Sequence, residues 1–342
     1  MGVQTNELAA VVLQKINTEV PDALEIETKL TSVLSTSGKK QQTGGLLIQC
    51  PIKLLVNVAK GAIPGTGATL ELTPSAQLQY MTFNWKYYYF GTNFTIADYN
   101  IATGPLEVVD FMEEKITGSA ADAARDWSTM LNSTSAGDNS LNFDGVLDWT
   151  AATGTAYGSL TDTDYLDKNS KSTLFLPLIY TDTYDPLGQA GGFTAINYNN
   201  FNKMTTDLRL RIKGFGKGKK VDAFCNGFVY SRIKTSLQAQ QIFINESDFI
   251  KAGFLGFEVD GVDVYPDADA PGSSTAGTND NYLYMLPEEI LKFWYHFGFG
   301  TKSIFDGEVR LPGSPVMSYQ NFLTGNPICT NRRLIAVAKN IG

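Results

Sequence analysis

Alternation of apolar and polar positions dominates the chain between residues 46 and 89. A period of two predicts a strand with one buried face. The breaker-rich stretch GAIPGTG at 61–67 separates two such runs, so they predict a long two-stranded hairpin. An isolated hairpin is marginally stable in water, and we expect its apolar face to lie on a partner subunit. That face comprises Ile48, Cys50, Ile52, Leu54, Val56 and Val58 in the first strand, and Met81, Phe83, Trp85, Tyr87 and Tyr89 in the second.

Helical periodicity appears most clearly at residues 105–132, where apolar residues recur every three or four positions after Pro105. Residues 5–20 predict a short amphipathic helix that ends before Pro21. The polar stretch from 22 to 42 predicts an arm with little core of its own. It is either a free tail or a segment that orders against a neighbouring subunit.

The remaining residues predict a mixture of short elements. Residues 133–200 are rich in Ser, Thr, Asp, Asn and Gly and predict loops with short strands. The further expectations are a strand at 174–180, a helix at 199–212, a strand at 221–230 followed by a helix capped by Ser231, a hairpin at 257–264 turning at Asp260-Gly261, strands at 282–286 and 291–297, and a terminal strand at 329–338.

Composition supports a folded chain that is rich in strands. Apolar residues make up 43% of the 342 residues, which excludes global disorder, and 32 Gly with 12% aromatics favour strands joined by turns. The net charge of −8 makes the chain a poor specific DNA binder, although such a chain could line a container for DNA. Residues 1–10 lack the plan of a signal peptide, and no apolar run reaches membrane-spanning length. We therefore expect a soluble protein without a membrane partner. The three cysteines are far apart, so buried free thiols are expected.

Candidate chemistry is sparse. The single histidine, His296, lies in an aromatic strand and is interpreted as half-buried and structural. The basic stretch KGFGKGKK at 213–220 fails the phosphate-loop pattern, both in glycine spacing and in the residue after Lys219. Two acidic groups lack the full calcium-loop pattern and are interpreted as solvated turn carboxylates. They comprise Asp162, Asp164 and Asp167, and Asp260, Asp263, Asp267 and Asp269. No catalytic, cofactor or metal site is predicted.

The order of these elements resembles that of tailed-bacteriophage major capsid proteins of the Hong Kong 97 type. The residues that carry the resemblance are TGGLLIQCPIKLLVNVAKGAIPG with FNWKYYYFGTNFTIADYN, NGFVYSRIKTSLQAQQIF, GFLGFEVDGVDVYPDAD, NYLYMLPEEILKFWYH and NFLTGNPICTNRRLIAVAKN. The last segment matches a closing pattern G-N-x-x-x-x-N-R-R through Gly325, Asn326, Asn331, Arg332 and Arg333.

The resemblance implies an α+β fold with an N-terminal arm, an extended hairpin called the E-loop, a peripheral domain with a long spine helix, and an axial domain. Residues 135–200 do not align and are treated as a variable insertion. The implied division is 1–42 for the arm, 43–91 for the E-loop, 92–205 for the peripheral domain with its spine helix at 105–132, 206–310 for the axial domain, and 311–342 for a C-terminal strand that returns to the core.

In function, the resemblance implies hexamers and pentamers that form an icosahedral shell around double-stranded DNA, assembled in a bacterial cytoplasm and ending in the virion. It implies a portal as partner, leaves a decoration protein open, and favours a separate scaffolding protein or none, because the chain starts directly with the arm. Lys60 is interpreted as a solvated lysine rather than a cross-linking one. The expected intersubunit contacts are Ile48, Leu54, Val56, Lys60, Phe83, Trp85, Tyr87, Tyr89, Lys39, Lys40, Arg332 and Arg333.

Three alternatives remain open. The first is an encapsulin, in which the same fold encloses an enzyme in a cellular compartment. The second is another virion component, such as a tail or decoration protein. The third is a strand-rich hydrolase that uses a pair of aspartates, with Asp162 or Asp263 as candidates.

Overall fold

The structure is a computed structural model that describes most of the chain. The described residues are 28–36, 38–53, 78–95, 105–135, 141–151, 155–161, 176–181, 197–212, 220–239, 256–272, 281–296, 309–310 and 316–341. The predicted helix at 5–20, the hairpin tip at 61–67, most of the basic stretch at 213–220 and the acidic group at 162–167 lie outside them.

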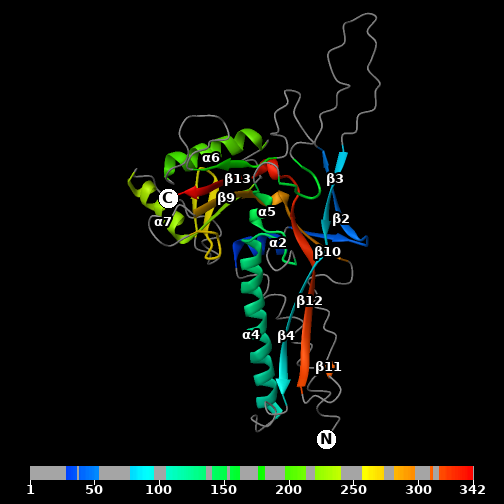
Figure 1. The fold of residues 1–342 in the computed structure, drawn as a ribbon. Helices are drawn as coiled ribbons and strands as arrows, with labels where there is room; N and C mark the ends of the chain where they lie inside the picture. Colours follow the sequence, from blue (N-terminus) through cyan, green and yellow to red (C-terminus); the bar gives the residue numbers. More distant parts are fainter. Residues whose placement is uncertain are drawn as a thin grey trace, which may run out of the picture.

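A six-stranded sheet forms one lobe (Figure 1). Helices α6 (Tyr198–Arg211) and α7 (Gly227–Ala239) share an apolar core with it. The Asp260-Gly261 turn has positive φ at both residues, as the predicted hairpin requires. The strands, in spatial order, are β5 (Leu178–Tyr180), β13 (Ala336–Ile341), β9 (Asn281–Pro287), β6 (Val221–Cys225), β8 (Val262–Pro266) and β7 (Phe257–Val259).

A second sheet extends away from this lobe and is organised around one long strand, β12 (Val316–Cys329). The first ten residues of β12 pair with β4 (Lys86–Thr95), and its end pairs with β10 (Leu291–His296). The shorter β11 (Val309–Arg310) also pairs with β12, and β1 (Lys39–Gln42) runs parallel to β10.

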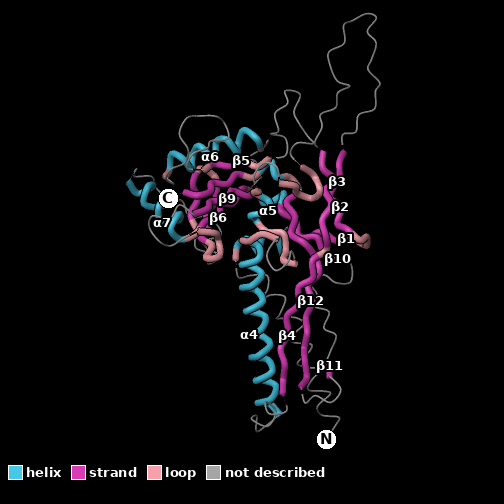
Figure 2. The backbone as a smooth tube through the Cα atoms, in the orientation of Figure 1, coloured by secondary structure: helices cyan, strands magenta, loops and turns pink. Residues whose placement is uncertain are grey.

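The longest helix, α4 (Pro105–Leu131), lies alongside β4 and β12 (Figures 1 and 2). It confirms the helix predicted at 105–132. Its buried residues Ala120, Ala123, Ala124 and Trp127 recur at helical spacing, and Trp127 meets Phe293 of β10 edge to face at 5.7 Å. Small side chains on this face allow a close approach to the sheet. Within the described helices, none combines the length and apolarity of a membrane-spanning segment.

Both strands of the predicted hairpin are present, but the second strand ends at Asn84 instead of continuing to Tyr89. Strands β2 (Leu47–Lys53) and β3 (Leu78–Asn84) pair antiparallel from Leu47 opposite Asn84 to Lys53 opposite Leu78. The strand then breaks at Trp85, and β4 pairs with β12 instead. The prediction of one continuous strand through Tyr89 is therefore wrong, because the pairing partner changes within a run whose alternation does not.

Residues 28–42 are not the coreless arm that their polarity predicts. Helix α2 (Lys29–Thr36) buries Leu30, Val33 and Leu34 in the main core, and β1 follows as an edge strand. A helix this short reveals its buried stripe through only three apolar residues, which explains why the polar average of the stretch was misleading.

Several residues of the described segments 141–151 and 155–160 likewise belong to the core, although the sequence predicts loops with short strands there. The one-turn helix α5 (Val146–Trp149) buries Trp149, and Phe143 lies just before it. Both aromatic rings join the core cluster that contains Trp127 and Phe293. The described part of this stretch is therefore packed rather than loop-like, and its interpretation as a variable insertion stays a prediction.

Two further boundaries differ from the prediction. The strand expected at 221–230 ends at Cys225, because the Asn226 side chain accepts a hydrogen bond from the Val229 amide at 3.0 Å and starts α7 there. Ser231 lies inside α7 and donates to the Gly227 carbonyl at 2.8 Å. The terminal strand is split by the short helix η5 (Arg332–Leu334) into the end of β12 and β13. All three cysteines are buried and free, as expected.

Candidate functional site

The described residues hold no group of three or more His, Cys, Asp or Glu side chains that could bind a metal ion. In the second acidic group, which was interpreted as solvated, Asp263 and Asp267 are buried, and each has a structural partner. Asp263 lies 3.1 Å from the Lys220 ammonium, and Asp267 accepts a hydrogen bond from the Asn132 amide at 3.2 Å. His296 is half-buried against Trp85 at a ring distance of 5.4 Å, as predicted.

The inner face of the hairpin is covered by this chain itself. Ile48 and Phe83 are 0% and 6% exposed, and Tyr157 meets the Phe83 ring at 5.0 Å. Gly158 lies so close that a Cβ atom there would be 2.7 Å from Met81 and Phe83. The prediction that Ile48 and Phe83 contact a neighbouring subunit is therefore wrong, because residues 157–160 occupy that face.

The outer face of the hairpin exposes apolar side chains instead. On this face Leu47 is 39% and Tyr80 55% exposed, and Leu46, which precedes β2, is 95% exposed. Tyr80 lies opposite Pro51 in the β2–β3 pairing, and Pro51 is exposed as well. This outer face is therefore available to a partner.

Strand β4 separates its tyrosines onto two faces. Tyr87 and Tyr89 are 72% and 69% exposed, and Tyr89 packs near Phe322 of β12 at 6.5 Å. Tyr88 points the other way, toward α4, and donates its hydroxyl to Asp126 at 3.4 Å. Burial, and then the charge of Asp126, raise the pKa of Tyr88 to about 12. The side of β4 away from α4 thus presents two exposed rings, which we call the β4 tyrosine face (Tyr87 and Tyr89).

Trp85 lies at the break between β3 and β4 and is half-buried. Its indole nitrogen donates to the Gly45 carbonyl at 2.9 Å. This bond joins the end of β3 to the residues just before β2, so Trp85 fixes the base of the hairpin relative to the β4 tyrosine face.

Of the four described basic residues predicted as intersubunit contacts, three are exposed and one is buried. Lys39 and Lys40 of β1 are exposed, and the Lys40 ammonium lies 4.3 Å from the centre of the Trp294 ring. Arg333 is exposed, but Arg332 is 1% exposed and donates to the carbonyls of Trp149 and Ala151 at 2.8 and 2.6 Å. The prediction that Arg332 contacts a neighbouring subunit is therefore wrong, because its side chain is buried within this chain. Leu54, Val56 and Lys60 lie outside the described residues.

Of the predicted contact residues, Trp85 thus lies beside the start of β4, the strand that carries the exposed Tyr87 and Tyr89. Sequence reasoning missed Leu46, Leu47 and Tyr80. Tyr80 and Leu47 alternate with the buried set, so their outward position could have been deduced from the same period of two once that set was assigned to the core.

The sequence matches no protein-family model and no curated protein. Among solved structures, the chain is similar to that of the cyanophage A-1(L) capsid, with a TM-score of 0.65, 14% identity, and 92% of this chain and 93% of that chain covered. It is also similar to the capsid of the native GTA particle, with a TM-score of 0.51, 12% identity and 91% of each chain covered. The SrpI encapsulin of Synechococcus elongatus gives a TM-score of 0.50 at 8% identity, with 92% and 89% covered.

These similarities extend along almost the whole of each chain, so they concern the complete architecture rather than one shared motif. The hairpin, the long helix beside a long β-ribbon, and the separate lobe with a six-stranded sheet occur here in the order that the sequence resemblance implies. The chain has the α+β fold of the Hong Kong 97-type capsid proteins.

Proposed function

We propose that this chain is the major capsid protein of a tailed bacteriophage, a structural subunit and not an enzyme. In this proposal it assembles into hexamers and pentamers of an icosahedral shell that encloses double-stranded DNA. The observation that carries the proposal is the similarity to the cyanophage A-1(L) capsid chain, which covers 92% of this chain at a TM-score of 0.65.

The exposed apolar side chains support a role in assembly. Large exposed apolar side chains are costly on a monomer when they form one surface, and tyrosine is enriched at protein interfaces. The β4 tyrosine face and the outer face of the hairpin (Leu47 and Tyr80), together with the preceding Leu46, are such surfaces. We propose that they, together with Trp85, Lys39, Lys40 and Arg333, contact neighbouring subunits. Leu54, Val56 and Lys60 remain proposed contacts.

The domain division follows from the same proposal. Residues 43–91 would form the E-loop, 92–205 the peripheral domain and 206–310 the axial domain, with 1–42 as an N-terminal segment whose described end packs in the core and 311–342 as the returning strand. The start of β4 lies within 43–91 but pairs with β12. The six-stranded sheet also takes β5 and β13 from outside 206–310. The axial lobe would meet its copies near the capsomer axis.

The proposed partners are copies of this chain, a portal, packaged DNA and, where one exists, a separate scaffolding protein. The net charge of −8 supports weak, sequence-independent contact with DNA rather than tight attachment. The proposed location is the virion capsid, after assembly in the host cytoplasm.

An encapsulin-type shell protein is the second candidate, because the SrpI encapsulin reaches a TM-score of 0.50 over 92% of this chain. Both candidates predict closed shells, and they differ in what the shell contains. Terminase and portal genes beside the coding sequence would favour the phage capsid, whereas a neighbouring gene for an enzyme that the shell encloses would favour the encapsulin.

Electron microscopy of the purified chain tests the shared part of the proposal. The chain is expressed alone and together with the products of neighbouring genes, and particles are examined in both preparations. Rings, sheets or closed shells of repeating capsomers are the expected result. A chain that stays monomeric in both preparations would refute the capsid function and return attention to the tail-protein and hydrolase alternatives.

A further inference from the structure

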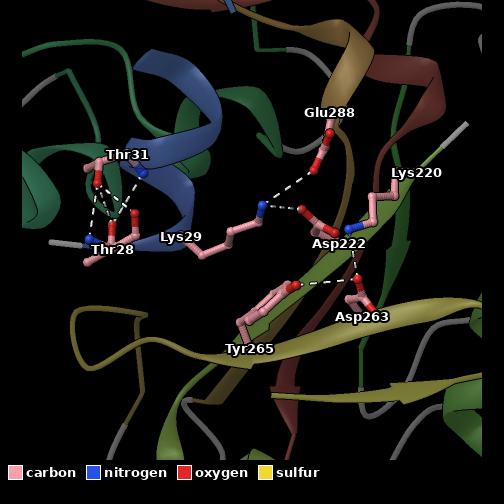
Figure 3. A network of polar contacts seen from close by, with 8 residues as sticks. All are labelled: Thr28, Lys29, Thr31, Lys220, Asp222, Asp263, Tyr265 and Glu288. Atoms are coloured by element: carbon pink, nitrogen blue, oxygen red, sulfur yellow. Dashed lines mark hydrogen bonds and ion pairs between the residues drawn. The ribbon is translucent and has the colours of Figure 1, made fainter. Parts of the chain in front are cut away.

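A buried group of charged side chains joins helix α2 to the six-stranded sheet (Figure 3). Lys29, the first residue of α2, extends its ammonium group toward Asp222 of β6 and Glu288 of the short helix η4 (Glu288–Ile290). Its Nζ lies 3.5 Å from Oε1 of Glu288 and 4.0 Å from Oδ2 of Asp222. The side chains of Lys29 and Asp222 are 5% and 1% exposed, so the protein replaces almost all of their water.

The backbone around Lys29 is fixed by two threonines. The Thr31 amide donates to Oγ1 of Thr28 at 3.3 Å, and the Thr28 amide donates to Oγ1 of Thr31 at 3.1 Å. This reciprocal arrangement satisfies two amides at the start of α2, as a capping box does. An ammonium group at a helix N-terminus is disfavoured by the helix dipole, and the ion pair with Glu288 at 3.5 Å offsets this cost.

Acids outnumber bases in this cluster. Lys220 is engaged by Asp263, with 3.1 Å between Nζ and Oδ2, and Tyr265 donates its hydroxyl to the same oxygen at 3.3 Å. Lys29 is then the ammonium group that Asp222 and Glu288 share. The charged and titratable groups that the surrounding elements bring to the cluster are Lys29 from α2, Lys220 and Asp222 from β6 and the residue before it, Asp263 and Tyr265 from β8, and Glu288 from η4.

In its ionised form, Asp222 is the least stabilised carboxylate of this cluster. Neither of its carboxyl oxygens accepts a hydrogen bond from a described residue, and an ionised carboxylate without hydrogen bonds is costly to bury. Burial, and then the charge of Glu288, raise the pKa of Asp222 to about 8, although Lys29 opposes this. Burial also lowers the pKa of Lys29.

We propose that Lys29, Asp222 and Glu288 form a proton-controlled latch, which holds α2 on the six-stranded sheet while Asp222 is protonated and weakens when Asp222 ionises. The inference rests on the fold and goes beyond the proposed function. Between α2 and β1, the Gly38 carbonyl accepts a hydrogen bond from the Phe293 amide of β10 at 2.8 Å, and β1 itself pairs with β10. The latch therefore controls whether α2, at residues 29–36, stays packed on the sheet.

The direction of the pH effect follows from proton linkage. Once α2 is released, Asp222 meets water and its pKa returns toward about 3.9. The latched state thus binds this proton more tightly, so the contribution of Asp222 is fully present below about pH 4 and is lost as pH rises toward about 8. One proton limits the change in the opening constant of α2 to about tenfold per pH unit.

Hydrogen–deuterium exchange of the full chain between pH 5 and pH 8 tests the latch. Exchange times are scaled for the intrinsic rate at each pH, and peptides that cover residues 28–36 are followed by mass spectrometry. The opening constant is expected to rise at least about tenfold from pH 5 to pH 7.5, within the one-proton limit. In Asp222→Asn, which carries no ionisable group, it is expected to stay constant, whereas Asp126→Asn on the exposed side of α4 keeps the wild-type response.

A wild-type opening constant that does not change with pH, or an Asp222→Asn variant that keeps the wild-type slope, would overturn the proposal. If Asp222→Asn does not fold, Glu288→Gln provides the second test. Removing the Glu288 charge lowers the pKa of Asp222, so the pH response must move to lower pH, and an unchanged response overturns the latch. These outcomes do not depend on shell formation, so they are separate from the electron microscopy that tests the capsid function.

Discussion

The guanidinium group of Arg332 reaches across the core and donates Nε to the Trp149 carbonyl at 2.8 Å. Its Nη2 donates to the Ala151 carbonyl at 2.6 Å, and the group lies 5.0 Å from the centre of the Tyr157 ring. One buried arginine thus joins the segment before β13 to the end of α5, more than 180 residues earlier in the chain.

Replacing Arg332 by methionine is expected to lower the free energy of unfolding by about 2–4 kcal/mol, because a buried and a half-buried carbonyl group lose their charged donor. Arg333→Met is the matched control, since Arg333 is exposed, and its change should stay within about 0.5 kcal/mol. Urea denaturation of both variants gives the comparison. Equal losses in the two variants would contradict the role assigned to Arg332.

Replacing Tyr87 and Tyr89 together by serine is expected to impair assembly and leave the fold intact. Both rings are exposed in the single chain, so the free energy of unfolding should change by less than about 1 kcal/mol. Loss of an aromatic contact at each copy of an interface is multiplied over a shell, so the yield of assembled particles should fall at least about tenfold. Light scattering and electron microscopy measure the yield.

Leu210→Ser is the control for that experiment, because Leu210 is 78% exposed on α6 in the other lobe. Unchanged assembly of the tyrosine variant would show that the β4 tyrosine face is not an intersubunit contact.

Replacing Gly158 by alanine is expected to destabilise the fold by about 2–4 kcal/mol. Gly158 has φ +58, and a Cβ atom there would lie 2.7 Å from both Met81 and Phe83. Gly118→Ala provides the opposite sign, since that position in α4 has nothing within 4 Å and alanine favours a helix by about 1 kcal/mol. Thermal unfolding of the two variants should therefore shift Tm in opposite directions.

Replacing Asp144 by asparagine is expected to remove part of the pH dependence of stability. Burial raises the pKa of Asp144 to about 6, although a hydrogen bond from the Asn326 side chain at 2.7 Å opposes this. The folded state therefore holds the proton more tightly than the unfolded state. Its contribution is fully present below about pH 4 and is lost as pH rises through about 6, by about 1–3 kcal/mol.

Urea denaturation at pH 4, 5, 6 and 7 measures this contribution as the difference between wild type and Asp144→Asn. The difference should become more favourable to the variant as pH rises and level off above about pH 7. A difference that is constant over the whole range would contradict the assignment.

Much of the fold could be predicted from local patterns. The periodicity of α4, the strands β9 and β10 and the Asp260-Gly261 turn depend on residues close in sequence, and each lies where the pattern indicates. These elements carry their own signal because their periodicity or turn chemistry is sufficient to specify them.

The faces of the hairpin could not be predicted in the same way. Phe83 and Tyr87 occupy equivalent positions in one alternating run, yet Phe83 is 6% exposed and Tyr87 is 72% exposed. The difference comes from residues 157–160, which cover β3 but not β4, and from the break at Trp85. Such long-range contacts leave no mark in the local pattern, so the alternation alone does not show which of these side chains are exposed.

Strand β12 has a mechanical consequence for any assembly built from this chain. It is paired along ten residues with β4 and then with β10, so a pull applied at the β4 tyrosine face is transmitted along one unbroken strand into the core. Hydrogen bonds in an antiparallel pair lie perpendicular to the strands, so a force along β12 loads the whole ladder in shear. All the hydrogen bonds of the ladder then resist separation of the strands together instead of opening one at a time. The β4–β12 pair is therefore the part of the subunit best suited to bear a stretching force.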